Sequence, residues 1–112
     1  MYRISAIIED AFREYLPLAE KRRVGFDIDF PDPTIRVERP SLVRGPLNEQ
    51  LPLAIKRAQR RVSLAVTKAG IVIRDDGVAL SPAAARELAG ELENVTVKSR
   101  VGFGTEVRIK FA

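Results

Sequence analysis

Ile71-Val72-Ile73-Arg74-Asp75-Asp76-Gly77 is the stretch of sequence that constrains the fold most strongly. Its run of β-branched residues favours a buried strand, and the Asp-Asp-Gly that follows is typical of a turn. Upstream, Val62, Leu64 and Val66 alternate with less apolar residues, and Lys68-Ala69-Gly70 separates this run from the next one. The alternation indicates a second, half-buried strand, so we predict a β-hairpin in this part of the chain.

Segments with helical periodicity surround the hairpin. Apolar residues recur at three- and four-residue steps over residues 4–19, 42–58 and 84–92, with charged residues filling the other positions. We expect the second helix to begin near residue 40 and to run to about residue 59. Ser81 is a favourable N-cap and Pro82 suits the first helical position, so the third helix is predicted to begin there.

Prolines fall inside the first two of these helical patterns. A proline within a helix removes a backbone hydrogen bond and collides with the preceding turn. We therefore expect Pro17 to kink or shorten the first helix, and Pro46 and Pro52 to interrupt the second.

The remaining segments read as strands. Residues 24–30 alternate between apolar and polar, and Ile35-Arg36-Val37 indicates a short strand. Residues 95–97 and 107–111 flank a Gly-Phe-Gly turn at 102–104. The predicted order is helix, two strands, helix, two strands, helix, two strands. We predict one α+β domain over residues 1–112: a two-layer α/β sandwich with about three helices on one face of a mixed, mainly antiparallel sheet.

The composition excludes several kinds of site. The 112 residues include no cysteine and no histidine, which excludes disulfides, thiolate metal sites and a phosphohistidine acceptor within the chain. Asp27, Asp29 and Asp32 alternate along a strand, whereas a calcium loop needs a turn that supplies further oxygen ligands. We predict no metal site.

The net charge of +4 raises the question of an acidic partner. The densest basic groups, Lys21-Arg22-Arg23 and Lys56-Arg57 with Arg60-Arg61, lie where helices are predicted to end, and the helix macrodipole favours cations there. No aromatic residue lies among them to stack on a base, so we do not expect a nucleic-acid partner. No apolar run approaches the ~20 residues of a membrane span, and no signal-peptide pattern is present, so we expect no membrane contact and a cytoplasmic location.

Residues 71–77 resemble the strand and first glycine box of the GHKL ATPases, the superfamily of histidine kinases, gyrase and related chaperones. In that family the Asp at the strand end accepts a hydrogen bond from the adenine amino group. Asp75 matches this Asp, Gly77 matches the first glycine of the box, and Ala79 stands where the second glycine is found.

Four further segments follow the order of the same family. The end of the first helix is similar to the family's start, and residues 47–56 resemble the N box. Residues 85–99 resemble the helix and strand that follow the second glycine box, and Gly102-Phe103-Gly104-Thr105 resembles the closing G-x-G-T hairpin. On this resemblance Thr105 is a nucleotide-binding residue. Glu49 falls where the family has Asn or Glu, in a position to polarise the attacking group or help hold the metal.

The resemblance implies the ATP-binding catalytic domain of a sensor histidine kinase, with a Bergerat-type sandwich. Such a domain binds ATP with Mg²⁺ and supplies the γ-phosphoryl group to a histidine on another domain. Its implied partner is a response regulator or a histidine-containing phosphotransfer domain. A chain without histidine is not expected to be catalytic by itself.

The departures from the family concentrate around the nucleotide. Leu53 replaces the Asn that would coordinate Mg²⁺ and offers no oxygen to a hard cation, and Pro52 beside it lacks a backbone N–H. The chain also runs directly from Gly77 to Ser81, without the lid and the second glycine-rich box that present backbone N–H groups to the phosphates.

These observations leave three hypotheses. The first is a degenerate ATPase domain that has lost nucleotide binding and serves as a scaffold or docking domain in two-component signalling. The second is a working ATP-binding domain that binds its nucleotide through Asp75. The third is a basic α/β module that binds nucleic acid or protein.

Overall fold

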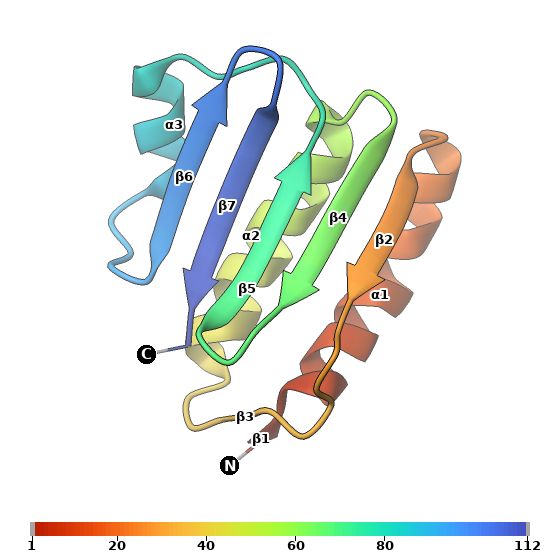
Figure 1. The fold of residues 1–112 in the computed structure, drawn as a ribbon, viewed down its shortest axis with the longest axis vertical. Coiled ribbons are helices and arrows are strands. Elements are labelled where there is room, and N and C mark those ends of the chain that lie inside the picture. Colours follow the sequence, from red (N-terminus) through yellow and green to blue (C-terminus); the bar gives the residue numbers. More distant parts are fainter. Residues whose placement is uncertain (1, 112) are drawn as a thin grey trace.

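The structure, a computed structural model, describes residues 2–111 and has two layers (Figure 1). A five-stranded sheet forms one layer, and α1 and α2 lie behind it, with α3 beside the edge strand β6. The predicted α+β sandwich is therefore confirmed. The elements in chain order are β1 (Tyr2–Arg3), α1 (Ile4–Lys21), β2 (Gly25–Asp29), β3 (Arg36–Val37), α2 (Ser41–Arg57), β4 (Arg61–Val66), β5 (Gly70–Asp75), α3 (Pro82–Ala89), β6 (Val95–Arg100) and β7 (Gly104–Lys110).

The strands of the main sheet are ordered β2-β4-β5-β7-β6. β2 runs parallel to β4, and every other neighbouring pair in this sheet is antiparallel. The predicted hairpin is β4–β5, with Leu64 opposite Ile73, and the Gly-Phe-Gly turn joins β6 to β7 as expected. β1 and β3 form a separate small antiparallel ladder.

The core lies between the sheet and the helices. Alternate residues of β4, β5 and β7 are buried on the helix side, and α2 buries one face against them, including Leu47, Leu51 and Ile55. Burying such a side chain stabilises the fold by roughly 1.5–3 kcal/mol. Because α2 crosses the middle of the sheet, its C-terminal end reaches the place where β5 ends.

Pro46 and Pro52 do not interrupt α2, so that prediction was wrong, and Pro17 does not shorten α1. α1 continues past Pro17 to Lys21, and α2 is continuous through Pro46 and Pro52. Pro46 is itself buried in the core. Packing of the apolar face against the sheet outweighs the backbone hydrogen bonds that each proline removes.

The helix ends follow the sequence more closely. Ser81 caps α3, since its hydroxyl accepts the N–H of Ala84 at 3.1 Å. Lys56 and Arg57 lie in the last turn of α2, which ends at Arg57, before the predicted residue 59. No helix within residues 2–111 is long and apolar enough to cross a membrane.

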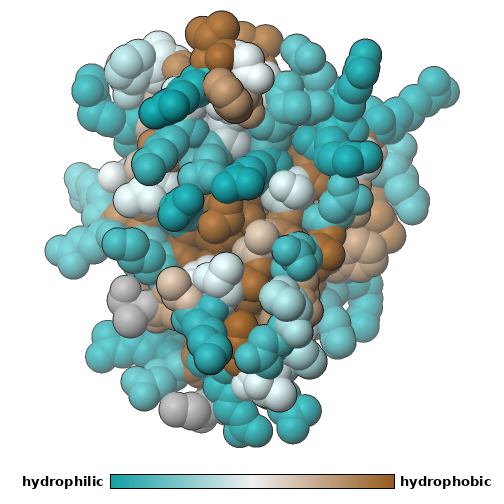
Figure 2. Space-filling model, viewed as in Figure 1, coloured by the Kyte–Doolittle hydropathy of each residue, from teal (hydrophilic) through white to brown (hydrophobic). Residues whose placement is uncertain are grey.

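The sheet face away from the helices is open. Figure 2 shows this face, where hydrophilic side chains surround a smaller hydrophobic area. Half of the outward positions of β5, β6 and β7 carry cations, and Glu106 lies among them; Arg74 and Arg108 contact its carboxylate at 2.7 and 2.8 Å.

Candidate functional site

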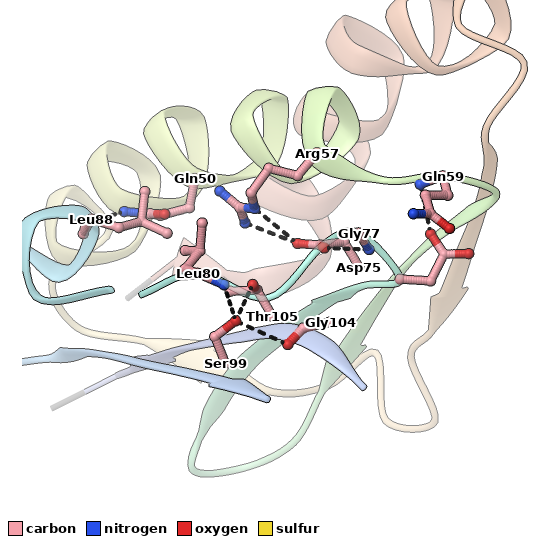
Figure 3. Close-up of polar contacts among 11 residues, drawn as sticks. Gln50, Arg57, Gln59, Asp75, Gly77, Leu80, Leu88, Ser99, Gly104 and Thr105 are labelled. Carbon is pink, nitrogen blue, oxygen red and sulfur yellow. Dashed lines mark hydrogen bonds and ion pairs between the residues drawn. The ribbon is translucent and has the colours of Figure 1, made fainter. Parts of the chain in front are cut away.

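The predicted site residues meet at the end of the sheet where β5 stops. Asp75 is the last residue of β5, and Thr105 lies opposite it on β7. Gly77 follows in the connection to α3, and the last turn of α2 brings Arg57 over the same point (Figure 3). The structure therefore gathers Asp75, Gly77 and Thr105, as the resemblance implies, and adds an arginine.

The Asp75 carboxylate is fully engaged by its own chain. Arg57 donates from Nε at 3.1 Å and from Nη2 at 3.0 Å to Oδ2, and the Gly77 backbone N–H donates to Oδ1 at 2.9 Å. The Asp75 side chain is 0% exposed and that of Arg57 is 17% exposed. A guanidinium thus occupies the acceptor that the resemblance assigns to the adenine amino group (Figure 3).

Two glycines allow this close packing. A Cβ on Gly77 would overlap the backbone carbonyl oxygen of Arg57, and a Cβ on Gly104 would overlap that of Asp75. Gly104 also has a φ of 80°, in the left-handed region that favours glycine. Both glycines are needed here because backbone approaches backbone, whether or not a ligand is bound.

The direct connection from β5 to α3 is fastened to the closing hairpin. Leu80 N–H donates to the Ser99 hydroxyl at 2.7 Å. That hydroxyl also lies 3.2 Å from the Gly104 carbonyl and 2.9 Å from the Thr105 hydroxyl (Figure 3). Thr105 is buried, so its hydroxyl serves the protein's own hydrogen-bond network. Ala79 lies in this connection and has a negative φ, the condition under which alanine substitutes mildly for glycine.

Asp76 holds the connection between α2 and β4. Its Oδ1 accepts backbone N–H groups from Gln59, Arg60 and Arg61 at 2.8, 3.0 and 3.2 Å. Burial of this carboxylate raises its pKa, but the three N–H donors outweigh that effect and leave the pKa below its ordinary value of 3.8. The two aspartates therefore have different roles. Asp75 binds Arg57, and Asp76 holds the loop that connects Arg57 to β4.

Glu49 lies on the exposed side of α2, about two turns before Arg57. It lines a groove of about 310 Å³ together with Leu53, Arg57 and residues of α3. Arg44, earlier on the same helix, contacts Asp10 of α1 at 3.1 Å. Within residues 2–111 no group of three or more Asp, Glu, His or Cys side chains is arranged to hold a metal ion.

Next to Glu49, Gln50 is buried between α2 and α3. Its Nε2 donates to the Leu88 carbonyl at 2.8 Å, while its Oε1 has no hydrogen-bond partner among the described residues. This contact fixes α3 against α2 at the side of the site.

Exposed apolar side chains surround the mouth of the site. Val78 is 74% exposed, Val101 is 90% exposed and Phe103 is 80% exposed, and all three line a hollow of about 410 Å³ together with Asp76 and Gly77. We call Val78, Val101 and Phe103 the apolar rim. Large apolar side chains with this much exposure, gathered in one place, are typical of a contact surface.

Comparison with known proteins rests on structure alone, because no protein-family model and no curated protein matches the sequence. The nucleotide-free catalytic domain of the histidine kinase ThkA superposes with a TM-score of 0.75 at 8% identity, covering 98% of this chain and 95% of that one. The cytoplasmic segment of the histidine kinase QseC gives a TM-score of 0.72 at 14% identity, covering 98% of this chain and 71% of that one.

The chain has the fold of a histidine kinase catalytic domain. A complex of ThkA with the response regulator TrrA is also similar, with a TM-score of 0.72 at 10% identity over 99% of this chain and 41% of that one. Within this fold, Arg57 binds the Asp75 carboxylate that the resemblance assigns to adenine, and the Ser99 hydroxyl accepts the backbone N–H of Leu80, beside α3.

The sequence did not predict the contacts that Arg57 and Ser99 make at this site. From the sequence, the favourable interaction of a cation with the helix macrodipole is enough to explain Arg57, because it lies in the last turn of α2. Ser99 looked like an ordinary strand residue. The one available signal was the missing second glycine box, since a shortened connection must find new partners for its backbone groups.

Proposed function

We propose that this chain is a degenerate ATPase domain of two-component signalling, which has lost nucleotide binding and serves as a docking scaffold. The observation that carries this proposal is the Asp75–Arg57 pair. Its carboxylate is 0% exposed and receives two charge-assisted hydrogen bonds from one guanidinium.

Adenine would have to displace Arg57 to reach Asp75. The amino group of adenine is a neutral donor, whereas the guanidinium is charged and donates twice, so the exchange loses electrostatic energy. Displacement would also break an ion pair that has little access to water, and it would leave the buried Asp75 carboxylate without its charged partner. Phosphate contacts that could offset this loss are missing, because Leu53 replaces the metal ligand and Leu80 N–H is bound to Ser99.

The apolar rim supports a docking role. Val78, Val101 and Phe103 are exposed at the mouth of the same site. ThkA, which shares the fold, has been seen in complex with a response regulator. We therefore propose a response regulator or a histidine-containing phosphotransfer domain as the partner, with the apolar rim in the contact.

A second candidate function, ATP binding by a working kinase domain, is favoured by the arrangement of Asp75 and Gly77. The Gly77 N–H holds the Asp75 carboxylate at the end of β5, as an adenine site requires. In this function Arg57 would swing away when nucleotide binds, and Glu49 would act on the attacking group or the metal.

Titration with MgATP and MgADP, followed by thermal shift and calorimetry, separates the two candidates. A bound nucleotide raises stability by RT ln(1 + [L]/Kd), about 2.7 kcal/mol at a hundredfold excess over Kd. We expect no shift at millimolar nucleotide for the wild type. A saturable shift that is lost in Asp75→Asn would overturn the degenerate-domain proposal in favour of the working kinase.

The docking role has its own test. Phe103→Ser and Val101→Ser should weaken binding to a panel of purified response regulators and phosphotransfer domains at least tenfold, while leaving the fold intact because both side chains are exposed. Leu92→Ser is the matched control, since Leu92 is 48% exposed but does not line the hollow at the site. Equal loss in the control, or no binding of any panel member by the wild type, would count against docking through the apolar rim.

A further inference from the structure

Another hollow, lined mainly by apolar side chains, lies between α1 and β2, the strand at the edge of the sheet opposite β6. It has a volume of about 800 Å³. The apolar side chains that line it on the helix side are Phe12, Leu16 and Pro17, and those on the strand side are Phe26, Ile28 and Phe30. We call it the α1–β2 groove. None of these six side chains is fully buried, and the rings of Phe12 and Phe26 lie 5.4 Å apart at its floor.

The strand beside the groove has a free edge. β2 pairs only with β4 among residues 2–111 and forms one end of the sheet. The Gly25 N–H donates to the Arg60 carbonyl at 2.7 Å, so the backbone groups of Gly25 point toward β4. Because successive residues of a strand point their N–H and C=O groups in opposite directions, those of Phe26 and Ile28 point outward. An edge of this kind is a template for another strand.

A strand added at this edge would meet different surroundings on its two faces. Phe26 and Ile28 face the groove, so alternate side chains of the added strand would lie over it and should be apolar. The intervening side chains would lie beside Asp27 and Asp29 on the open face of the sheet, where cations are favoured.

The charge around the groove also favours an added strand that carries basic residues. The charged side chains on the helix side of the groove are the carboxylates of Glu9 and Glu20 and the guanidinium of Arg13, and the carboxylates of Asp27 and Asp29 lie beside it on the open face of the sheet. The whole chain carries +4, so this face has the opposite sign to the rest of the protein. Arg61 contacts Asp27 at 3.1 Å, but both side chains are more than half exposed, so the pair screens the carboxylate only weakly.

We propose that the α1–β2 groove binds an extended peptide segment that alternates apolar and basic residues, by addition as a further strand to β2. Backbone hydrogen bonds to Phe26 and Ile28 supply affinity, and the apolar groove and the carboxylates supply specificity. A second copy of this chain fits less well. Antiparallel pairing of two β2 strands about their middle residue places Asp27 opposite Asp27, and like charges directly opposite destabilise a sheet.

The test uses the whole chain and a fluorescent peptide of alternating lysine and valine, followed by anisotropy. We expect saturable binding that weakens with salt and falls at least tenfold when glutamate replaces lysine in the peptide. N-methylation should abolish binding when it falls on the residues whose backbone N–H groups point toward β2, either the valines or the lysines. The valines are expected if the added strand is antiparallel to β2 and the lysines if it is parallel, so the result also gives the direction of the strand. No binding of the lysine–valine peptide, or binding that survives both methylations, overturns the proposal.

Variants of the protein locate the site. Ile28→Pro removes an outward N–H but no hydrogen bond to β4, and Leu16→Lys places a cation in the groove; each should weaken the peptide at least tenfold. Leu92→Lys is the matched surface control and should change nothing. Unchanged affinity in both groove variants would refute the location. Sedimentation of the free chain completes the test: a dimer that Ile28→Pro dissociates would show that a second copy occupies the edge and would overturn the peptide proposal.

Discussion

Replacing Arg57 by methionine tests the reasoning about the site most directly. Methionine keeps an unbranched, flexible side chain that can occupy much of the same space, while the charge disappears. The Asp75 carboxylate would then remain 0% exposed with only the Gly77 N–H as donor, at 2.9 Å. Leaving a buried charge without its partner typically costs about 3–5 kcal/mol.

The cost of breaking the buried Arg57–Asp75 pair can be compared with the cost of breaking an exposed ion pair. Arg61 also pairs with an aspartate at 3.1 Å, but its side chain is 70% exposed and that of Asp27 is 59% exposed. A pair this exposed contributes about 0.2–1 kcal/mol. Arg61→Ala is therefore the matched control, with similar geometry and little burial.

Urea unfolding at neutral pH measures both variants. With an m-value of about 1–3 kcal/mol per molar for a small domain, a loss of about 3 kcal/mol lowers the midpoint by about 1 M or more. We expect that shift for Arg57→Met and a much smaller one for Arg61→Ala. Shifts of equal size in the two variants would refute the argument that Asp75 depends on Arg57, and with it the structural basis of the degenerate-domain proposal.

Three further predictions concern the surroundings of this pair. Gly77→Ala should lower the unfolding free energy by about 1–3 kcal/mol, because its Cβ would overlap the Arg57 carbonyl. Gly45→Ala, where a Cβ meets open space in the middle of α2, should raise it by about 0.5–1 kcal/mol. Urea midpoints measure both variants, and shifts in the same direction would contradict the packing around Gly77. The pKa of Asp76 is below 3.8 in the folded protein, so its ionised form stabilises the fold above that pH, and this contribution is lost as the pH falls further. Asp76→Asn should therefore flatten the acid side of a curve of unfolding free energy against pH. An unchanged curve would count against stabilisation of the carboxylate by the three N–H donors. Ser99→Ala removes the acceptor of the Leu80 N–H, and hydrogen exchange at Leu80 should become at least tenfold faster; unaltered protection would mean that the connection to α3 is held by other contacts.

Local signals in the sequence were reliable where the structure depends on local periodicity. The alternation that predicted the β4–β5 hairpin and the Ser81 cap of α3 are both present, because strand pleating and helix capping involve residues close together in the chain. Asp75 and Gly77 stand at the end of β5 as the motif implied.

The prolines show where local reasoning was insufficient. Pro46 and Pro52 predicted interruptions, and Pro17 predicted a kink or a shortened helix, yet each lies within a continuous helix. The cost of a proline is local, but the burial that outweighs it depends on the sheet beneath the helix, which the local pattern does not contain.

The sequence by itself determined the order of the helices and of the main-sheet strands, though not the short β1, together with the turn at Asp75-Asp76-Gly77 and the absence of a second glycine box. Only the tertiary structure decided what the shortened site contains. Arg57 is 18 residues from Asp75 in the chain, and its guanidinium reaches the carboxylate because α2 crosses the sheet and ends above β5. Likewise, Phe26 and Ile28 become a free edge only because β2 is the outermost strand. Periodicity specifies which face of an element is buried, whereas the position of one element over another follows from packing of the whole core.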